Sequence, residues 1–485
     1  MHISQLLVSQ GIISPQQLEK ASAMMTADSG RFTDQLVQLG LVQKATMDAI
    51  VSRAPEMPTS IKATGLGLSM LLRMMLKAMA VDGLETPTRL AHRLALPAAL
   101  IQQLMQDAAE KHLIESIGQS RLTESVEVRY ILTTMGRQWA AEALQQSQYV
   151  GPVPVTLRDY SEQVSRQGMA TQRVGMEHVQ QAFKRMVMPD SLIRKLGPAV
   201  NSATSMLLYG APGNGKTTIA RLVGRIFSDV VFIPHCIEVQ GQIIKIFDPS
   251  MHEPIVDDDT PDVHTGIRRD SIDPRWVPCR RPIIITGGEL TLDMLDLKYN
   301  QDVKFYEAPI HMKALNGTFI VDDFGRQLVS PTQLLNRWIV PLENRIDYLK
   351  LHTGKSFMIP FDERVIFSTN LEPDDLMDTA FLRRIPYKLE IPFPTVEEYR
   401  RIFRMMARAR DLDCSDQDVD FVIQELQTKN NQHLACYQPK FIIEQVLASC
   451  RFEGVAPKLA RDHVAEALTN LYTKRAIVGQ TQAAV

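Results

Sequence analysis

The chain has 485 residues, 45% of them hydrophobic, and a formal net charge of −2 at pH 7, so it can bury large cores and carries no overall field that attracts nucleic acid or anionic membranes. Its length predicts about three domains. The five cysteines show no paired spacing and no apolar run reaches about 18 residues, so we expect a cytoplasmic protein with reduced thiols and no membrane insertion.

A repeat occupies the first 60 residues. Residues 7–13 (LVSQGII) match residues 36–42 (LVQLGLV), and each half has one glycine, Gly11 or Gly40, where two short helices would meet. Two such helical pairs can bury their apolar faces against each other. The sequence therefore predicts a small helical domain over residues 1–60.

This repeat resembles the N-terminal domain of type II secretion and type IV pilus assembly ATPases, of which related versions bind cyclic di-GMP. The ligand-binding versions begin each repeat with Arg-Leu-Gly. Here the corresponding residues are 2–4 (HIS) and 31–33 (RFT), so both glycines are absent and only Arg31 remains. We therefore expect no cyclic di-GMP binding, and the resemblance implies a docking module for a protein such as a secretion or pilus component.

Residues 65–148 are predicted to form a second domain, in which three helices, a β-hairpin and a closing helix follow one another. This order resembles a winged helix. Its candidate recognition helix offers Lys111 beside Asp107 and Glu110, whereas DNA readers place several Lys and Arg against phosphates. We favour a protein-contact module and keep DNA as the alternative partner.

Residues 149–175 begin with the sequence YVGPVPV and are predicted to be a stiff, extended linker. A helical stretch over residues 176–196 follows, and it leads into the apolar run 206–209. The linker would separate the two N-terminal domains from the rest of the chain.

A phosphate-binding loop with the pattern G-x-x-x-x-G-K-T follows that apolar run. Its glycines let backbone N–H groups surround phosphate oxygens, and the next helix presents its positive N-terminal end. Lys216 is expected to reach the β- and γ-phosphates, and the Thr217 hydroxyl to complete a Mg²⁺ shell. The predicted ATP-binding residues are Gly210, Ala211, Pro212, Gly213, Asn214, Gly215, Lys216, Thr217 and Thr218.

Two later apolar runs end in polar residues that suit the same site. Residues 317–321 are followed by Asp322 and Asp323, and residues 364–369 by Asn370. Parallel strands end at one edge of a sheet, where ligands bind. We expect Asp322 to hold Mg²⁺ through water, Asp323 to orient the attacking water, and Asn370 to position that water or sense the γ-phosphate.

This ordered series resembles an AAA+ ATPase over roughly residues 176–472. The resemblance implies an α/β nucleotide-binding domain over residues 176–394, with a parallel sheet flanked by helices, and a helical lid domain over residues 395–476. It also implies Mg²⁺-dependent ATP hydrolysis by a homo-oligomeric ring, expected to be a hexamer, and adenine packing by the helical stretch before the loop.

Three basic residues gain an expected role from the same resemblance. Arg383 and Arg384 lie in a segment that looks like the one carrying the arginine finger, which acts on the γ-phosphate of a neighbouring subunit. Lys440 lies where the lid carries its second sensor. The simpler alternative is that all three are solvated cations near helix ends.

The chain departs from the family pattern at the acidic pair and in two added segments. Asp323 stands where the family has Glu, so either the water must sit closer or hydrolysis slows. A hairpin is predicted around Gly241. A second hairpin, over residues 347–360, stands where some AAA+ branches touch their substrate; Lys350, His352 and Lys355 are the contact candidates, with a solvated surface hairpin as the alternative.

We predict an ATPase that remodels or assembles a protein partner selected by its N-terminal domains, in the manner of a chaperone. Two alternatives stay open. The first is a nucleotide-dependent DNA-binding regulator that uses the winged helix. The second is an ATP-gated scaffold of a secretion or pilus system with little hydrolysis.

Overall fold

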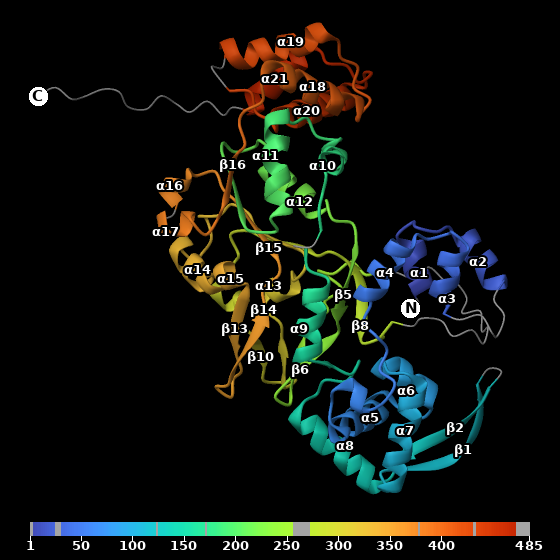
Figure 1. Cartoon of the computed structure of the whole chain (residues 1–485). Helices are drawn as coiled ribbons and strands as arrows, with labels where there is room; N and C mark the ends of the chain where they lie inside the picture. Colours follow the sequence, from blue (N-terminus) through green and yellow to red (C-terminus); the bar gives the residue numbers. More distant parts are fainter. Residues whose placement is uncertain are drawn as a thin grey trace, which may run out of the picture. The chain divides into compact units, whose positions relative to one another are not determined.

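A computed structural model describes residues 3–24, 31–122, 125–169, 172–255, 272–376, 379–429 and 433–471 (Figure 1). The chain forms two compact units. Unit 1 contains residues 1–172, 227–319 and 333–364, and unit 2 contains residues 173–226, 320–332 and 365–485. The segment predicted as one nucleotide-binding domain is thus divided, because residues 227–319 and 333–364 pack in unit 1.

Four short helices form the start of unit 1 as two consecutive pairs. Gly11 and Gly40 lie at the turn within each pair with φ of 66° and 69°, a conformation that suits glycine. The side chains of Leu7 and Leu36, which correspond in the repeat, are both fully buried. The predicted helical repeat is present, as α1 (Ile3–Ser9), α2 (Pro15–Ala23), α3 (Phe32–Gln38) and α4 (Lys44–Arg53).

The next part of unit 1 has the predicted order of three helices, a hairpin and a fourth helix. Strands β1 and β2 pair antiparallel, and Met75, Leu90 and Leu104 are fully buried in the core between the helices. The elements are α5 (Leu68–Asp82), α6 (Pro87–Leu94), α7 (Ala98–Glu110), β1 (Ile114–Leu122), β2 (Ser125–Leu132) and α8 (Thr134–Gln146).

The segment predicted as an extended linker contains regular structure. Strand β3 (Val155–Thr156) is followed at once by helix α9 (Leu157–Arg166), and the Thr156 hydroxyl caps the helix by accepting the N–H of Asp159 at 3.1 Å. Tyr160 and Val164 on α9 are buried. The linker prediction was wrong over residues 155–166, because burial of one helix face outweighs the proline-rich start.

Most of the remaining strands of unit 1 form small sheets, one with the order β10-β11-β7-β6-β3. The hairpin predicted around Gly241 is confirmed by the antiparallel pair β6–β7. The elements are β5 (Val230–Pro234), β6 (Cys236–Val239), β7 (Gln242–Lys245), β8 (Trp276–Arg280), β9 (Ile283–Thr286), β10 (Lys298–Asn300), β11 (Phe305–Glu307), α13 (Ile310–Lys313), most of α14 (Pro331–Arg337) and α15 (Ile339–Asn344).

The second predicted hairpin is also confirmed, as β13 (Ile346–Lys350) paired antiparallel with β14 (Ser356–Pro360). Its tip is held against neighbouring strands. The ring of His352 stacks on Tyr299 with centroids 4.1 Å apart, and the His352 backbone N–H donates to the Tyr306 hydroxyl at 2.8 Å. Lys350 and Lys355 stay exposed, and their role as substrate contacts remains a prediction.

Unit 2 contains a parallel sheet with helices around it, so the fold is α/β as predicted. Strand β4 pairs parallel with both β15 and β16, and the order across this part of the sheet is β16-β4-β15-β12. The elements are α10 (Met176–Phe183), α11 (Asp190–Asn201), β4 (Met206–Tyr209), α12 (Lys216–Gly224), β12 (Thr318–Val321), β15 (Arg364–Ser368), α16 (Pro373–Leu376), α17 (Thr379–Leu382) and β16 (Tyr387–Glu390).

The last helices of unit 2 surround a core of their own, in which Tyr399, Val422 and Ile442 are fully buried. They are α18 (Val396–Arg408), α19 (Asp416–Gln424), α20 (Gln438–Glu453) and α21 (Arg461–Leu471). We call residues 395–471 the lid segment. Within the described ranges, no helix combines the length and the apolar character needed to cross a bilayer.

Candidate functional site

The phosphate-binding loop connects β4 to α12 in the geometry that its glycines predict. Gly213 and Gly215 have φ of 79° and 86°, which a residue with a Cβ adopts only with strain. Gly210 is required for a second reason, since a Cβ there would lie 2.6 Å from the backbone oxygen of Ile391. The loop therefore keeps its backbone N–H groups at the start of α12, where the helix dipole favours an anion.

Lys216 is the first residue of α12, and its side chain is 6% exposed. Its Nζ donates to the backbone oxygens of Gly210 at 2.8 Å and Ala211 at 2.9 Å, and to Oδ1 of Asn370 at 2.6 Å. Burial lowers the pKa of Lys216, while the nearby charges of Asp322 and Asp323 act to raise it. The lysine thus already joins the loop to the end of β15.

Thr217 and Asp322 place a hydroxyl and a carboxylate side by side. The Thr217 Oγ1 donates to the two carboxylate oxygens of Asp322 at 2.8 and 3.0 Å. Oxygen ligands of these two kinds suit Mg²⁺, which keeps several waters and binds substrate phosphates at its other positions. In the described ranges no group of three or more His, Cys, Asp or Glu side chains is placed to hold a metal ion.

Asp323 is exposed and has a φ of 49°, in the left-handed region. Two hydrogen bonds fix the backbone beside it: the Phe324 N–H donates to the Ser368 oxygen at 2.7 Å, and the Thr369 hydroxyl donates to the Phe324 oxygen at 2.7 Å. These bonds join the end of β12 to the end of β15. The strain of the positive φ is thus held at a candidate site, where such conformations concentrate.

Asn370 stands between the lysine and the second aspartate. Its Oδ1 accepts from Lys216, and its Nδ2 lies 3.4 Å from Oδ1 of Asp323. The structure therefore brings together Lys216 and Thr217 at the start of α12 and the three polar residues that follow β12 and β15. Their individual roles stay predictions.

The arginines and Lys440 lie in other surroundings. Arg383 is exposed directly after α17, and the Arg384 guanidinium lies 5.7 Å from the centre of the Phe381 ring. The Lys440 side chain is 60% exposed on α20, with Nζ 3.9 Å from the Glu444 carboxylate one turn further along. The ion-pair partner of Lys440 among the described residues therefore lies on the same helix, α20.

Two lid residues that the sequence did not single out contact the phosphate loop. The Tyr437 ring covers Gly213 so closely that a Cβ there would lie 2.3 Å from Cδ1 of the tyrosine. The Cys436 backbone N–H donates to Oδ1 of Asn214 at 3.4 Å. No local pattern could reveal these contacts, because the partners lie more than 200 residues apart in the chain.

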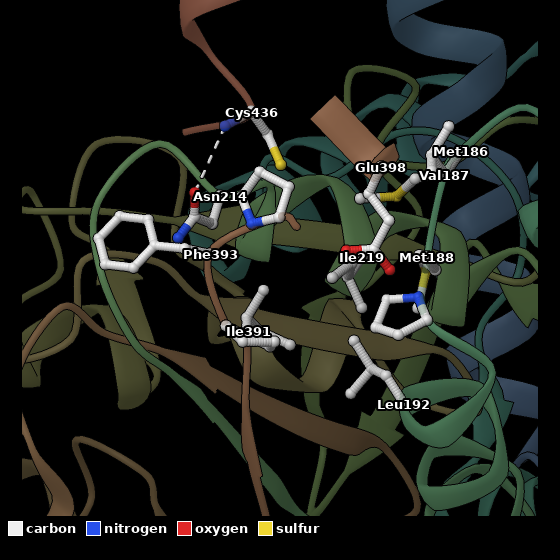
Figure 2. A pocket seen from close by; sticks show the side chains of 13 residues that line it. Met186, Val187, Met188, Leu192, Asn214, Ile219, Ile391, Phe393, Glu398 and Cys436 are labelled. Carbon is white, nitrogen blue, oxygen red and sulfur yellow. Dashed lines mark hydrogen bonds between the residues drawn. The ribbon is translucent and has the colours of Figure 1, made fainter. Parts of the chain in front are cut away.

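A narrow apolar cavity of about 30 Å³ lies beside the loop (Figure 2). This volume has room for one or two water molecules. Part of its wall, residues 186–192, falls in the helical stretch where the sequence predicts adenine packing. Its lining residues are Met186, Val187, Met188, Pro189, Leu192, Asn214, Ile219, Ile391, Pro392, Phe393, Pro394, Glu398 and Cys436.

Comparisons with known proteins give partial matches. Residues 395–470, most of the lid segment, match the model of a family described as a domain of unknown function, DUF8689. A stretch of 47 residues is 47% identical to a vesicle-fusing ATPase of Dictyostelium discoideum. That stretch covers 10% of this chain and 6% of the vesicle-fusing ATPase, so the chain matches only a small part of that relative.

Three similar solved structures have low identity and low TM-scores. A variant of RuvB from Thermotoga maritima is 15% identical, with 61% of this chain and 73% of that chain covered and a TM-score of 0.34. Domain III of the Thermotoga maritima replication initiation protein DnaA is 12% identical (60% and 96% covered, TM-score 0.34), and NtrX from Brucella abortus is 11% identical (68% and 60% covered, TM-score 0.34). Similarity at this level does not assign the chain to a family.

Proposed function

We propose that the chain is an AAA+ ATPase that binds ATP with Mg²⁺ and hydrolyses it, with the lid segment closing over the nucleotide. One observation carries the proposal. Lys216 and Thr217 at the start of α12 contact Asn370 and Asp322, so that the phosphate loop and the ends of two parallel strands form a single polar cluster. A phosphate-binding loop, a Mg²⁺-binding pair and a polar amide at one edge of a parallel sheet are the parts that ATP hydrolysis requires.

The residues of this cluster would have three different roles: phosphate binding, Mg²⁺ binding and activation of water. Lys216 would exchange its loop carbonyl partners for phosphate oxygens, and the N–H groups of the loop would bind the others. Thr217 and Asp322 would hold Mg²⁺, which neutralises charge that develops on the phosphates. Asp323 and Asn370, 3.4 Å apart in this structure, would bind the attacking water between them, with the carboxylate taking its proton.

The apolar cavity would receive the base. At about 30 Å³ it must widen before a purine enters. Met186 and Met188 suit this change because the unbranched thioether side chain adopts many shapes at low cost. Phe393 is 41% exposed, and its ring stacks on that of His433 with centroids 5.0 Å apart, so widening at this side would displace that stacked pair. The proposal therefore expects the cavity walls, and not the phosphate loop, to move most on binding.

The roles of the two aspartates can be separated by measuring binding and hydrolysis side by side. Asp323→Asn should bind Mg²⁺-ATP as the wild type does and lose most hydrolysis, since it keeps the shape but cannot accept the proton. Asp411→Asn is the matched control, because Asp411 is also exposed and has a φ of 52°. If Asp323→Asn hydrolyses ATP at the wild-type rate, the proposed role of Asp323 is wrong.

We also propose that the active site is shared between subunits of a homo-oligomeric ring, through Arg383 or Arg384. A mixture of an Arg383→Ala/Arg384→Ala chain with a Lys216→Ala chain should recover activity that neither shows alone, because one supplies the phosphate loop and the other the arginine. An arginine supplied by a neighbour is worth on the order of 10³ in rate. A mixture without activity, together with wild-type activity that does not rise with protein concentration, would exclude a shared site.

The N-terminal domains are proposed to select a protein partner. Two arginines that could face DNA phosphates are already paired, Arg93 with Asp82 at 2.7 Å and Arg129 with Glu85. Those pairs reduce the positive charge available to DNA. We expect no salt-dependent gel shift of duplex DNA by the full chain at micromolar concentrations; a shift that weakens steeply with added salt would instead support the DNA-binding regulator.

A further inference from the structure

Asn214, in the middle of the phosphate loop, holds a buried hydrogen-bond donor that has no partner in the described ranges. The residue is 2% exposed. Its Oδ1 accepts the N–H of Cys436 at 3.4 Å, whereas its Nδ2 is buried without an acceptor. Buried polar groups in native proteins are nearly always hydrogen-bonded, so an exception of this kind indicates a missing partner.

The orientation of the amide follows from its one hydrogen bond. A backbone N–H can only donate, so the group that faces Cys436 must be the oxygen of Asn214. The NH₂ group therefore points away from the Cys436 N–H, toward the side of the cavity where Phe393 lies (Figure 2). Asn214 thus contacts the lid segment with one end and offers two N–H donors at the other.

Most of the cavity wall is apolar around this donor, as at Ile219, Ile391 and Phe393. The carboxylate of Glu398, a polar side chain of the wall, is used by the helix cap: its Oε2 accepts from the backbone N–H and the hydroxyl of Thr395 at 2.8 and 3.0 Å. Since the described residues leave the Asn214 Nδ2 without a partner, a ligand in the cavity can supply the acceptor. Ring nitrogens of a purine are acceptors at the edge of a flat apolar surface, and this combination matches the donor and the apolar walls.

Building on the proposed nucleotide binding, we propose that Asn214 is a specificity-determining residue: its Nδ2 donates a hydrogen bond to a ring nitrogen of the purine base, while its Oδ1 keeps the lid segment in place through Cys436. One side chain then links the base to the lid. A nucleotide whose base lacks the acceptor nitrogen would leave the donor unpaired in an apolar cavity, and it would be rejected for that reason.

The test compares Mg²⁺-ATP with 1-deaza-, 3-deaza- and 7-deaza-ATP, each of which replaces one ring nitrogen by C–H. One of the three should bind the wild-type chain roughly 2- to 10-fold more weakly than ATP, which is the range expected for one neutral hydrogen bond. In Asn214→Ala this difference should vanish. Asn470→Ala, which changes an exposed asparagine of α21 in the lid segment, is the matched control and should keep it.

Either of two results would overturn the inference: wild-type affinities for all three analogues within about twofold of ATP, or a difference that persists in Asn214→Ala. If Asn214→Ala does not fold, Asn214→Asp replaces it, because it keeps the acceptor for Cys436 and removes the donor. A wild-type chain that binds no ATP would contradict the proposed function itself, whereas ATP binding without the nitrogen-specific difference contradicts only the role of Asn214.

Discussion

Gly213→Ala should disturb the phosphate loop through a clash with the lid segment. The added Cβ would lie 2.3 Å from Cδ1 and 3.0 Å from Cγ of Tyr437, and the residue must keep a φ of 79°. A left-handed conformation costs an alanine about 1–2 kcal/mol, and overpacking of this kind costs about 1–3 kcal/mol. Gly213→Ala should therefore lower the free energy of unfolding by the sum of the two, about 2–5 kcal/mol.

Thermal unfolding of the wild type and four variants separates the two contributions. Gly454→Ala is the matched control, because Gly454 has a φ of 70° and no atom within 4 Å of an added Cβ, so it should lower the unfolding temperature by the conformational cost alone. Gly213→Ala should lower it further. In a cycle with Tyr437→Ala, the clash contribution should disappear, and the double variant should show a coupling free energy of about 1–3 kcal/mol. Strictly additive effects of Gly213→Ala and Tyr437→Ala would refute the contact between loop and lid segment.

Three further predictions concern the buried carboxyl group of Glu363, the buried cysteine thiols and the N-terminal repeat. Glu363 is fully buried, its carboxylate oxygens have no partner in the described ranges, and burial raises the pKa of its carboxyl group. The folded chain therefore keeps this carboxyl protonated at pH values where the unfolded chain has lost the proton. The free energy of unfolding should fall as pH rises above about 4.5, by up to about 1.4 kcal/mol per pH unit, and urea unfolding of Glu363→Gln should show a smaller fall. Burial raises the pKa of the Cys236 and Cys279 thiols to about 12, so a thiol reagent at pH 8 should label half-buried Cys414 before either of them. Calorimetry on the full chain should detect no cyclic di-GMP binding, and a dissociation constant near or below about 1 μM would contradict this.

The phosphate loop and its partner strands could be predicted from sequence because their signals are local. Glycine spacing defines the loop, and each of the other strands is an apolar run that ends directly at its polar residues, Asp322 and Asp323 or Asn370. The rule that parallel strands end at one sheet edge then brings them together. For the same reason the two hairpins and the helical repeat with Gly11 and Gly40 were predictable.

Other features depend on contacts between distant residues or on burial. The sequence gives no sign that Tyr437 covers Gly213, since neither residue is unusual in its own surroundings. Helix α9 was missed because prolines precede it, although Thr156 as its cap and the spacing of Tyr160 and Val164 are helical signals. The division of residues 176–364 between two units likewise follows from packing, which local patterns do not encode.

The central claim is that the loop containing Lys216 binds the phosphates of ATP, and calorimetric titration of Mg²⁺-ATP into the full chain tests it most directly. The wild type should give saturable binding with one nucleotide per chain. Lys216→Ala, which removes the charge that reaches the β- and γ-phosphates, should weaken this affinity at least about 10-fold, a change of about 1.4 kcal/mol. Equal affinities of the two chains for Mg²⁺-ATP, or no binding by the wild type, would contradict the assignment of this site.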